Sequence, residues 1–168
     1  MKGKKILIPV LLLITLIAIG VTIWALCFRD TAPVLAPDYA PVEEESNAQA
    51  IEDDSGEKLE AEEGGGAVSL TYSNEVTISL ADAAATVQIT NPTRSNQSML
   101  IQLMIQDVKI GQSGTIPPGN QLTVIPLDEN ITLEPGTYEG MFHLLFFDTE
   151  TNERANLNTN IPVTITVE

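Results

Sequence analysis

The chain has 168 residues, enough for one ordinary domain, and a net charge of −15 with only eight lysines and arginines. Residues 68–168 hold three scattered cationic side chains, Arg94, Lys109 and Arg154. That region should repel nucleic acid rather than bind it. A single cysteine, Cys27, excludes an internal disulfide.

The first predicted element is an apolar run without charged side chains over residues 6–28. As a helix it reaches about 35 Å, enough to cross a hydrocarbon core about 30 Å thick. Lysines precede the run, and aromatic rings suited to the membrane interface lie at its far end; these anchor residues are Lys2, Lys4, Lys5, Trp24 and Phe28. The positive-inside rule then keeps residues 1–5 in the cytoplasm and places the C-terminal part outside the cell membrane.

Two other interpretations of this run are left open. A cleaved signal peptide has an apolar stretch of about 7–15 residues, whereas this run is longer. A lipoprotein signal ending at Cys27 would have Leu26 where such signals usually place a small residue. We therefore predict an uncleaved, single-pass transmembrane helix, with Cys27 as a small apolar residue at the membrane edge.

The second segment, residues 31–67, contains three Ala-Pro pairs, many acidic side chains and a run of glycines at its end. Its apolar residues follow neither helical nor strand spacing. Such a composition cannot bury enough apolar surface to offset the entropy of ordering, so the sequence predicts a disordered acidic linker that holds the next domain away from the membrane. The acidic clusters lack the spacing of a calcium-binding loop, so no metal site is expected there.

The third segment, residues 68–168, alternates between apolar and polar residues, as half-buried strands do. Turn residues separate six or seven such runs at 91–92, 111–114, 117–119, 135–136 and 149–160. This spacing is typical of an antiparallel β-sandwich. The residues expected to face its core are Val76, Ile78, Leu80, Val87, Ile89, Met99, Ile101, Leu103, Ile105, Tyr138, Phe142, Leu144, Phe146, Val163, Ile165 and Val167.

The stretch LEPGTY, residues 133–138, combines an apolar residue, a Pro-Gly corner and a tyrosine that enters the longest strand. It resembles the corner before the sixth strand of fibronectin type III and bacterial Ig-like domains. TNPTRSN, residues 90–96, is similar to the end of the second strand in pilus-chaperone-like folds. The resemblance implies an all-β, Ig-like β-sandwich of about seven strands over residues 76–167. It also implies a structural corner made by Leu133, Pro135, Gly136 and Tyr138, in which the tyrosine hydroxyl bonds to the backbone upstream.

Residues 68–168 offer few groups for chemistry. They contain one histidine, His143, and no cysteine, and they lack a G-x-S-x-G nucleophile motif, a P-loop and a dinucleotide fingerprint. A zinc site at His143 would need carboxylates as its other ligands, which is rare. We therefore expect no enzyme activity, no cofactor, no metal and no small-molecule substrate.

One face of the predicted sandwich is unusually apolar for a side that meets water. Its members alternate with core residues on two neighbouring strands and form the candidate partner surface: Leu100, Met104, Met141, His143, Leu145 and Phe147. An exposed apolar patch marks a contact surface, and aromatic residues and methionine are enriched in interface cores. A bulge that shifts the register, or cover by the N-terminal strand or linker, would instead bury these side chains.

These observations predict a non-enzymatic, membrane-anchored extracytoplasmic module of a bacterial cell envelope. It would bind another protein or a cell-wall component through one face of its sandwich. The alternative is a structural accessory subunit of a membrane assembly, such as a secretion or conjugation apparatus. In that case the membrane helix would itself make specific contacts, although it has few small residues for helix packing.

Overall fold

The computed structural model describes residues 15, 36–52, 56–61, 65–129 and 131–168. Its contacts divide the chain into two compact units, Met1–Leu35 and Ala36–Glu168. The predicted anchor residues at 2, 4, 5, 24 and 28 lie outside the described residues, and Thr15, which lies within the apolar run, is helical. Within the described ranges, no helix is both long enough and apolar enough to cross a membrane.

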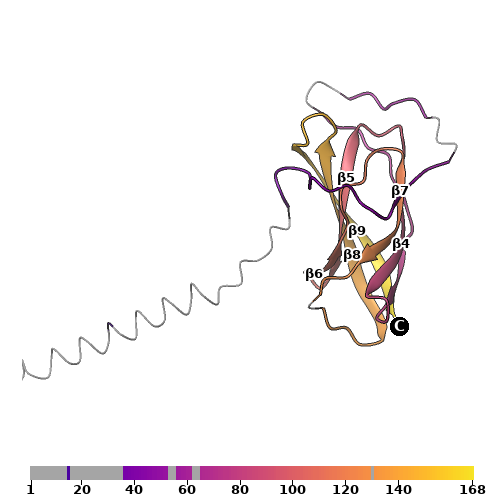
Figure 1. The fold of residues 1–168 in the computed structure, drawn as a ribbon, viewed down its shortest axis with the longest axis vertical. Coiled ribbons are helices and arrows are strands. Elements are labelled where there is room, and N and C mark those ends of the chain that lie inside the picture. Colours follow the sequence, from indigo (N-terminus) through magenta and orange to yellow (C-terminus); the bar gives the residue numbers. More distant parts are fainter. Residues whose placement is uncertain (1–14, 16–35, 53–55, 62–64, 130) are drawn as a thin grey trace, which may run out of the picture. The chain divides into compact units, whose positions relative to one another are not determined.

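The regular secondary structure in the described part of the second unit consists of β-strands (Figure 1). They are β1 (Ala48–Ala50), β2 (Thr71–Tyr72), β3 (Glu75–Ser79), β4 (Ala84–Asn91), β5 (Gln97–Ile105), β6 (Val108–Gln112), β7 (Asn120–Pro126), β8 (Gly136–Asp148) and β9 (Arg154–Val167). They form one sheet in the order β1-β7-β4-β3-β9-β8-β5-β6, with β2 pairing to β4. All pairs are antiparallel except β3 with β9.

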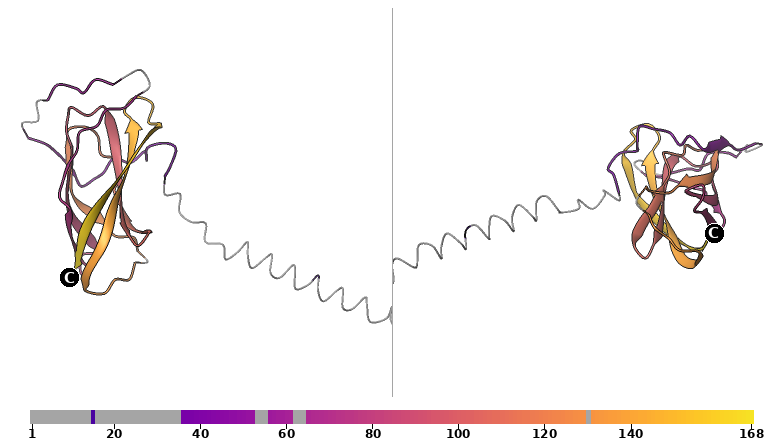
Figure 2. Two further views of the ribbon diagram at one scale, coloured as in Figure 1. Left: turned by 180° about the vertical axis from the view of Figure 1, so that it is seen from behind. Right: turned by 60° about the horizontal axis from the view of Figure 1, so that its bottom comes forward.

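This sheet curls around its own core (Figure 2). Strand β3 joins the two halves, because it pairs with β4 on one side and with β9 on the other. On the opposite side β6 meets the end of β7, where Gly111 forms a bridge with Leu127 and the Asp128 N–H donates to the Ile110 carbonyl at 2.9 Å. A Cβ on Gly111 would lie 2.6 Å from the Pro126 carbonyl oxygen, so this approach requires a glycine. The result is a sandwich-like, all-β domain.

The alternation of apolar residues predicts the core well. The predicted inward residues of the strands are buried inside the curl, and Tyr138 packs against them from its edge. Leu80 is the exception: β3 ends at Ser79, so Leu80 lies in the following turn and is 38% exposed. The pattern of alternation continued one position beyond the strand that produces it.

Two stretches predicted as turns, 111–114 and 149–160, lie partly in strands in the structure. Strand β6 follows β5 through a two-residue loop, Gln106 and Asp107, and both residues have positive φ, at 49° and 64°. Such a loop usually contains Asn-Gly or Asp-Gly, so Gln-Asp gave no hairpin signal. Strand β9 begins at Arg154 rather than after residue 160, because the long β8 offers backbone partners to polar residues as readily as to apolar ones.

The prediction of a disordered linker over residues 31–67 is wrong for the described residues that follow Ala36. Residues 36–50, which we call the strap, cross the upper part of the sandwich (Figure 1, indigo). The Arg154 N–H donates to the Asp38 carbonyl at 2.8 Å, the Ala40 N–H donates to the Asn152 carbonyl at 2.8 Å, and β1 pairs with β7. Backbone hydrogen bonds hold the strap, and composition does not reveal them. The compact domain therefore begins at Ala36 and not at residue 68.

Candidate interaction surface

The six residues of the predicted partner surface do lie on one face of the sheet, on the side of β5 and β8 that points away from the core. The register of these strands places Leu100 opposite Leu145 and Met104 opposite Met141. It also places His143 opposite Gln102. The pairing runs without interruption from Gln97–Asp148 to Ile105–Gly140, so no bulge between these strands shifts the apolar side chains.

Half of this face is closed, which corrects the prediction of an exposed surface. Leu100, Leu145 and Phe147 are completely buried and form a small second cluster. Ala36 and Ala40 of the strap pack against that cluster. The apolar residues on the outer side are therefore a second, local core, and cover by the N-terminal segment is the explanation that applies.

The other half of the face remains accessible in part. Met104 is 7% exposed, whereas Met141 and His143 are half-buried. The neighbouring positions on β9 are Pro162 opposite Met141 and Asn160 opposite His143, and both are exposed. We call Met141, His143, Asn160 and Pro162 the Met141 patch.

A hydrogen bond orients the ring of His143. Its Nδ1 lies 2.6 Å from Oδ1 of Asn160. A carboxamide oxygen only accepts, so Nδ1 carries the hydrogen and donates it. The ring is thereby fixed across two strands, with an apolar methionine on one side. Nothing in this arrangement resembles a nucleophile and base pair.

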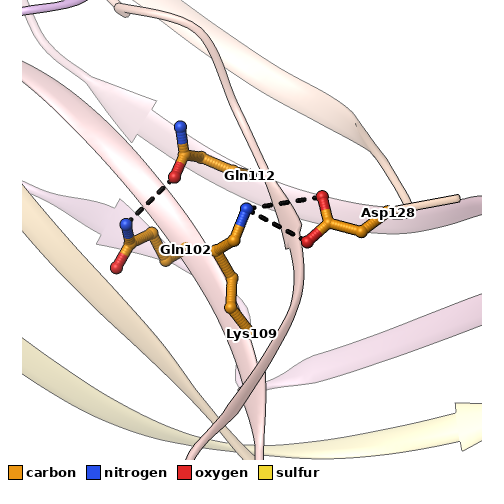
Figure 3. Close-up of polar contacts among 4 residues, drawn as sticks. All are labelled: Gln102, Lys109, Gln112 and Asp128. Atoms are coloured by element: carbon orange, nitrogen blue, oxygen red, sulfur yellow. Dashed lines mark hydrogen bonds and ion pairs between the residues drawn. The ribbon is translucent and has the colours of Figure 1, made fainter. Parts of the chain in front are cut away.

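Polar side chains continue the outer face toward β6 (Figure 3). Gln102 Nε2 donates to Gln112 Oε1 at 3.0 Å, which links β5 to β6. Lys109 Nζ lies 3.0 Å from Oδ2 of Asp128, which links β6 to the residues after β7. Asp128 is 38% exposed in its side chain, so this ion pair contributes little to stability, about 0–1 kcal/mol. The pair connects β6 with the residues after β7, at the side where the two ends of the curled sheet meet.

Glu45 fastens the strap to the loop after β6. Its side chain is 9% exposed, and its Oε2 accepts from the Gly114 N–H at 2.6 Å. The Glu45 N–H donates to the Thr115 carbonyl at 2.9 Å, and the Thr115 hydroxyl donates to the Pro41 carbonyl at 3.0 Å. A Cβ on Gly114 would lie 2.9 Å from Cα of Glu45. The strap can therefore pack this closely only because residue 114 has no side chain.

Sequence reasoning missed this contact set. It treated Glu45 as one of several solvated acids and Gly114 as an ordinary turn glycine. The partners are 69 residues apart in the chain. No local pattern in either segment predicts the other, because the strap is held mainly through the backbone.

The tyrosine corner has the predicted hydrogen bond. The Tyr138 hydroxyl donates to the Glu134 carbonyl at 2.8 Å. Leu133 is half-buried against the core, while Pro135 and Gly136 are exposed at the bend. The corner fixes the entry of β8, the strand that pairs with both β5 and β9.

Removing the corner hydroxyl tests how much this bond contributes. Tyr138→Phe should lower the free energy of unfolding by about 1 kcal/mol, because it removes one hydrogen bond while keeping the ring. Urea denaturation followed by circular dichroism measures the change. Tyr72→Phe is the matched control at a 47% exposed position, where a change within about 0.5 kcal/mol is expected. Equal effects at both positions would show that the corner bond does not stabilise the fold.

Asp148 shapes the turn between β8 and β9. The N–H groups of Thr151 and Glu150 donate to its Oδ1 at 2.8 and 2.9 Å, and they lower the pKa of this carboxyl below its ordinary value, with the Thr151 bond the larger cause. A lowered pKa in the folded state means that the turn is stabilised above the ordinary pKa. That contribution is lost as the pH falls through the folded-state pKa.

Among the described residues, no group of three His, Cys, Asp or Glu side chains could hold a metal ion.

Comparison with known proteins adds structural neighbours of low similarity. No protein-family model and no curated protein matches the chain. The structure aligns with AggA, the major subunit of aggregative adherence fimbriae type I from Escherichia coli, over 61% of this chain and 95% of that one, at 10% identity and a TM-score of 0.33. It aligns with the CooA pilin subunit from enterotoxigenic Escherichia coli over 60% and 98%, at 12% identity and a TM-score of 0.26. At these TM-scores the similarity carries no argument about family or function.

Proposed function

We propose that this protein is a membrane-anchored, extracytoplasmic, Ig-like module that binds a protein or a cell-envelope component and performs no chemistry. The observation that carries the proposal is the half-covered outer face of β5 and β8. The strap closes one half of this face, and the Met141 patch leaves the other half accessible. The uncharged run over residues 6–28 supports the anchor.

The connectivity of the strands supports the Ig-like assignment. Strand β3 pairs antiparallel with β4 and parallel with the last strand, β9, so the first long strand bridges the two halves of the sheet. A tyrosine corner stands at the entry of β8, as Ig-like sandwiches place it before their sixth strand. Together these features favour an Ig-like sandwich over other antiparallel arrangements.

The Met141 patch has the composition of a contact surface. Met141 offers a flexible, polarisable side chain, and Pro162 beside it is rigid and exposed. His143 and Asn160 supply polar groups at the rim. A small apolar centre with a polar rim is the usual anatomy of a protein interface.

A capture experiment tests this surface. The full chain, carrying an affinity tag, is incubated with detergent-solubilised envelope of the source organism, beside Met141→Glu and Thr164→Glu variants. Thr164 is an exposed β9 residue opposite Glu139 and outside the patch, so it is the matched control. We expect Met141→Glu to reduce recovery of the partner at least about tenfold, since hot-spot losses reach 2 kcal/mol or more. Equal recovery by both variants would refute the Met141 patch as the binding surface.

The alternative function is an accessory subunit of a membrane assembly. It predicts that the partner contacts residues 6–28 rather than the sandwich. The same capture experiment with those residues replaced by an unrelated membrane helix separates the two. Loss of the partner in that chimera, with normal recovery by Met141→Glu, would support the assembly subunit.

A further inference from the structure

We propose that the groove beneath the strap is an extended-peptide site, and that the strap of one copy of this chain binds in the groove of a second copy. This goes beyond the proposed function, because the partner is the chain itself and the surface is not the Met141 patch.

The groove holds the strap partly through hydrogen bonds to its backbone, which do not depend on the side chains of the strap. Residues Ala48–Ala50 of the strap add a strand to the edge of β7, at Asn120–Leu122. Glu44 forms a parallel bridge with Thr115, in which the Glu45 N–H donates to the Thr115 carbonyl at 2.9 Å and the Thr115 N–H donates to the Glu43 carbonyl at 3.3 Å. Addition of a strand to a sheet edge is a recurring way to bind an extended peptide.

The groove also contacts three side chains of the strap, those of Ala36, Ala40 and Glu45. Ala36 and Ala40 cover the completely buried Leu100, Leu145 and Phe147, so residues at these positions contact the floor of the groove. The Gly114 N–H at the far end receives a carboxylate, which Glu45 supplies. Tyr39 and Val42, by contrast, are 61% and 100% exposed, so the groove does not select the side chains at these two positions. The preferred ligand therefore has small residues four apart and an acidic residue five positions later.

The strap is joined to the sandwich by a connector long enough for exchange. Residues 51–67 span about 55 Å when extended, at about 3.3 Å per residue. A domain of about 130 residues has a radius of gyration of about 14 Å, so such a connector can reach the groove of an adjacent copy. Among the described residues of the connector, Ile51 and Ala67 at its two ends bond to Gly119 and Asn96. Between these ends, the Leu59 N–H donates to the Arg94 carbonyl and Lys58 Nζ donates to the Ser95 carbonyl, and these two bonds break when the connector extends.

Exchange conserves the bonds that hold the strap. The partners described above belong to the sandwich: Gly114, Thr115, the β7 edge and the buried cluster. A strap from a second copy makes the same contacts. The equilibrium between a strap bound in its own chain and one bound in a second copy therefore depends on two concentrations. One is the concentration of neighbouring copies, and the other is the effective concentration of the tethered strap, about millimolar for short flexible linkers. Copies held close together on one surface would favour exchange.

Cysteine crosslinking of full-length chains tests the proposal. Gln49 in the strap is the register partner of Gln121 in β7, and paired antiparallel residues lie within the Cα distance that a disulfide spans. In chains with Cys27→Ser, one population carries Gln49→Cys and the other carries Gln121→Cys. They are mixed in detergent at rising concentration, then oxidised. We expect a mixed dimer at least about tenfold more abundant than with a Thr164→Cys partner, which is exposed on β9 away from the groove.

Two further chains make the result decisive. The double variant Gln49→Cys/Gln121→Cys must form an intrachain disulfide at low concentration, which verifies the register. Gly114→Val, which obstructs the seat of Glu45, should abolish the mixed dimer. An intrachain disulfide in the double variant without a mixed dimer at any concentration would overturn the proposal, and so would a mixed dimer that Gly114→Val leaves unchanged. Neither outcome bears on the Met141 patch.

Discussion

Replacing Phe142 with alanine should lower the free energy of unfolding by about 3–5 kcal/mol. Phe142 is completely buried in the middle of β8, where it pairs with Leu103 on β5 and Ile161 on β9. Its ring lies in the core on β8, the strand that pairs with both β5 and β9. Truncation to alanine leaves a cavity that the paired strands cannot close. Urea denaturation of the full chain, followed by circular dichroism, measures the loss.

The control for this prediction is Val108→Ala, at a position 56% exposed at the start of β6. A surface truncation of this kind should change the unfolding free energy by no more than about 0.5 kcal/mol. Because ordinary domains are stable by only about 5–15 kcal/mol, the Phe142 variant should also unfold at a visibly lower urea concentration. A loss below about 1 kcal/mol would show that Phe142 is not in the core and that the strand alternation has been misassigned.

Replacing Leu145 with glutamate should release the strap and destabilise the domain, with an expected cost of about 3–5 kcal/mol for an unpaired buried charge. Leu145 is completely buried beneath Ala36 and Ala40. A carboxylate cannot remain there without a partner, so it draws water and the strap must leave. Limited proteolysis with a glutamate-specific protease reports this directly, because release exposes Glu45, which is buried in the folded chain, and frees the backbone beside it for cleavage.

Met141→Glu is the matched control on the same strand and face. Met141 is half-buried and has no strap above it, so its carboxylate reaches solvent. Stability and protease resistance of the strap should stay close to those of the unaltered chain. If Leu145→Glu left both properties unchanged as well, the outer face would be open, and the covering role of the strap would be wrong.

The sequence predicted the inner architecture because strand periodicity is local. Each set of alternating residues, such as Val163, Ile165 and Val167, needs only its own neighbours to identify the side that faces the core. The corner at Tyr138 could be predicted for the same reason, since donor and acceptor are four residues apart. Leu80 and the Gln106–Asp107 loop mark the limits of local reasoning, where a strand ends early or a hairpin forms without its usual residues.

The sequence by itself determined the uncharged apolar run, the acidic composition, the all-β character of the C-terminal part and the residues of its core. Only the tertiary structure decided the boundary at Ala36, the buried role of Glu45 and the division of the outer face into a covered half and an accessible half. The physical reason is that the strap is held by main-chain hydrogen bonds and by contacts between distant segments. Every residue has the same backbone donor and acceptor, so composition and spacing cannot show which of them will pair.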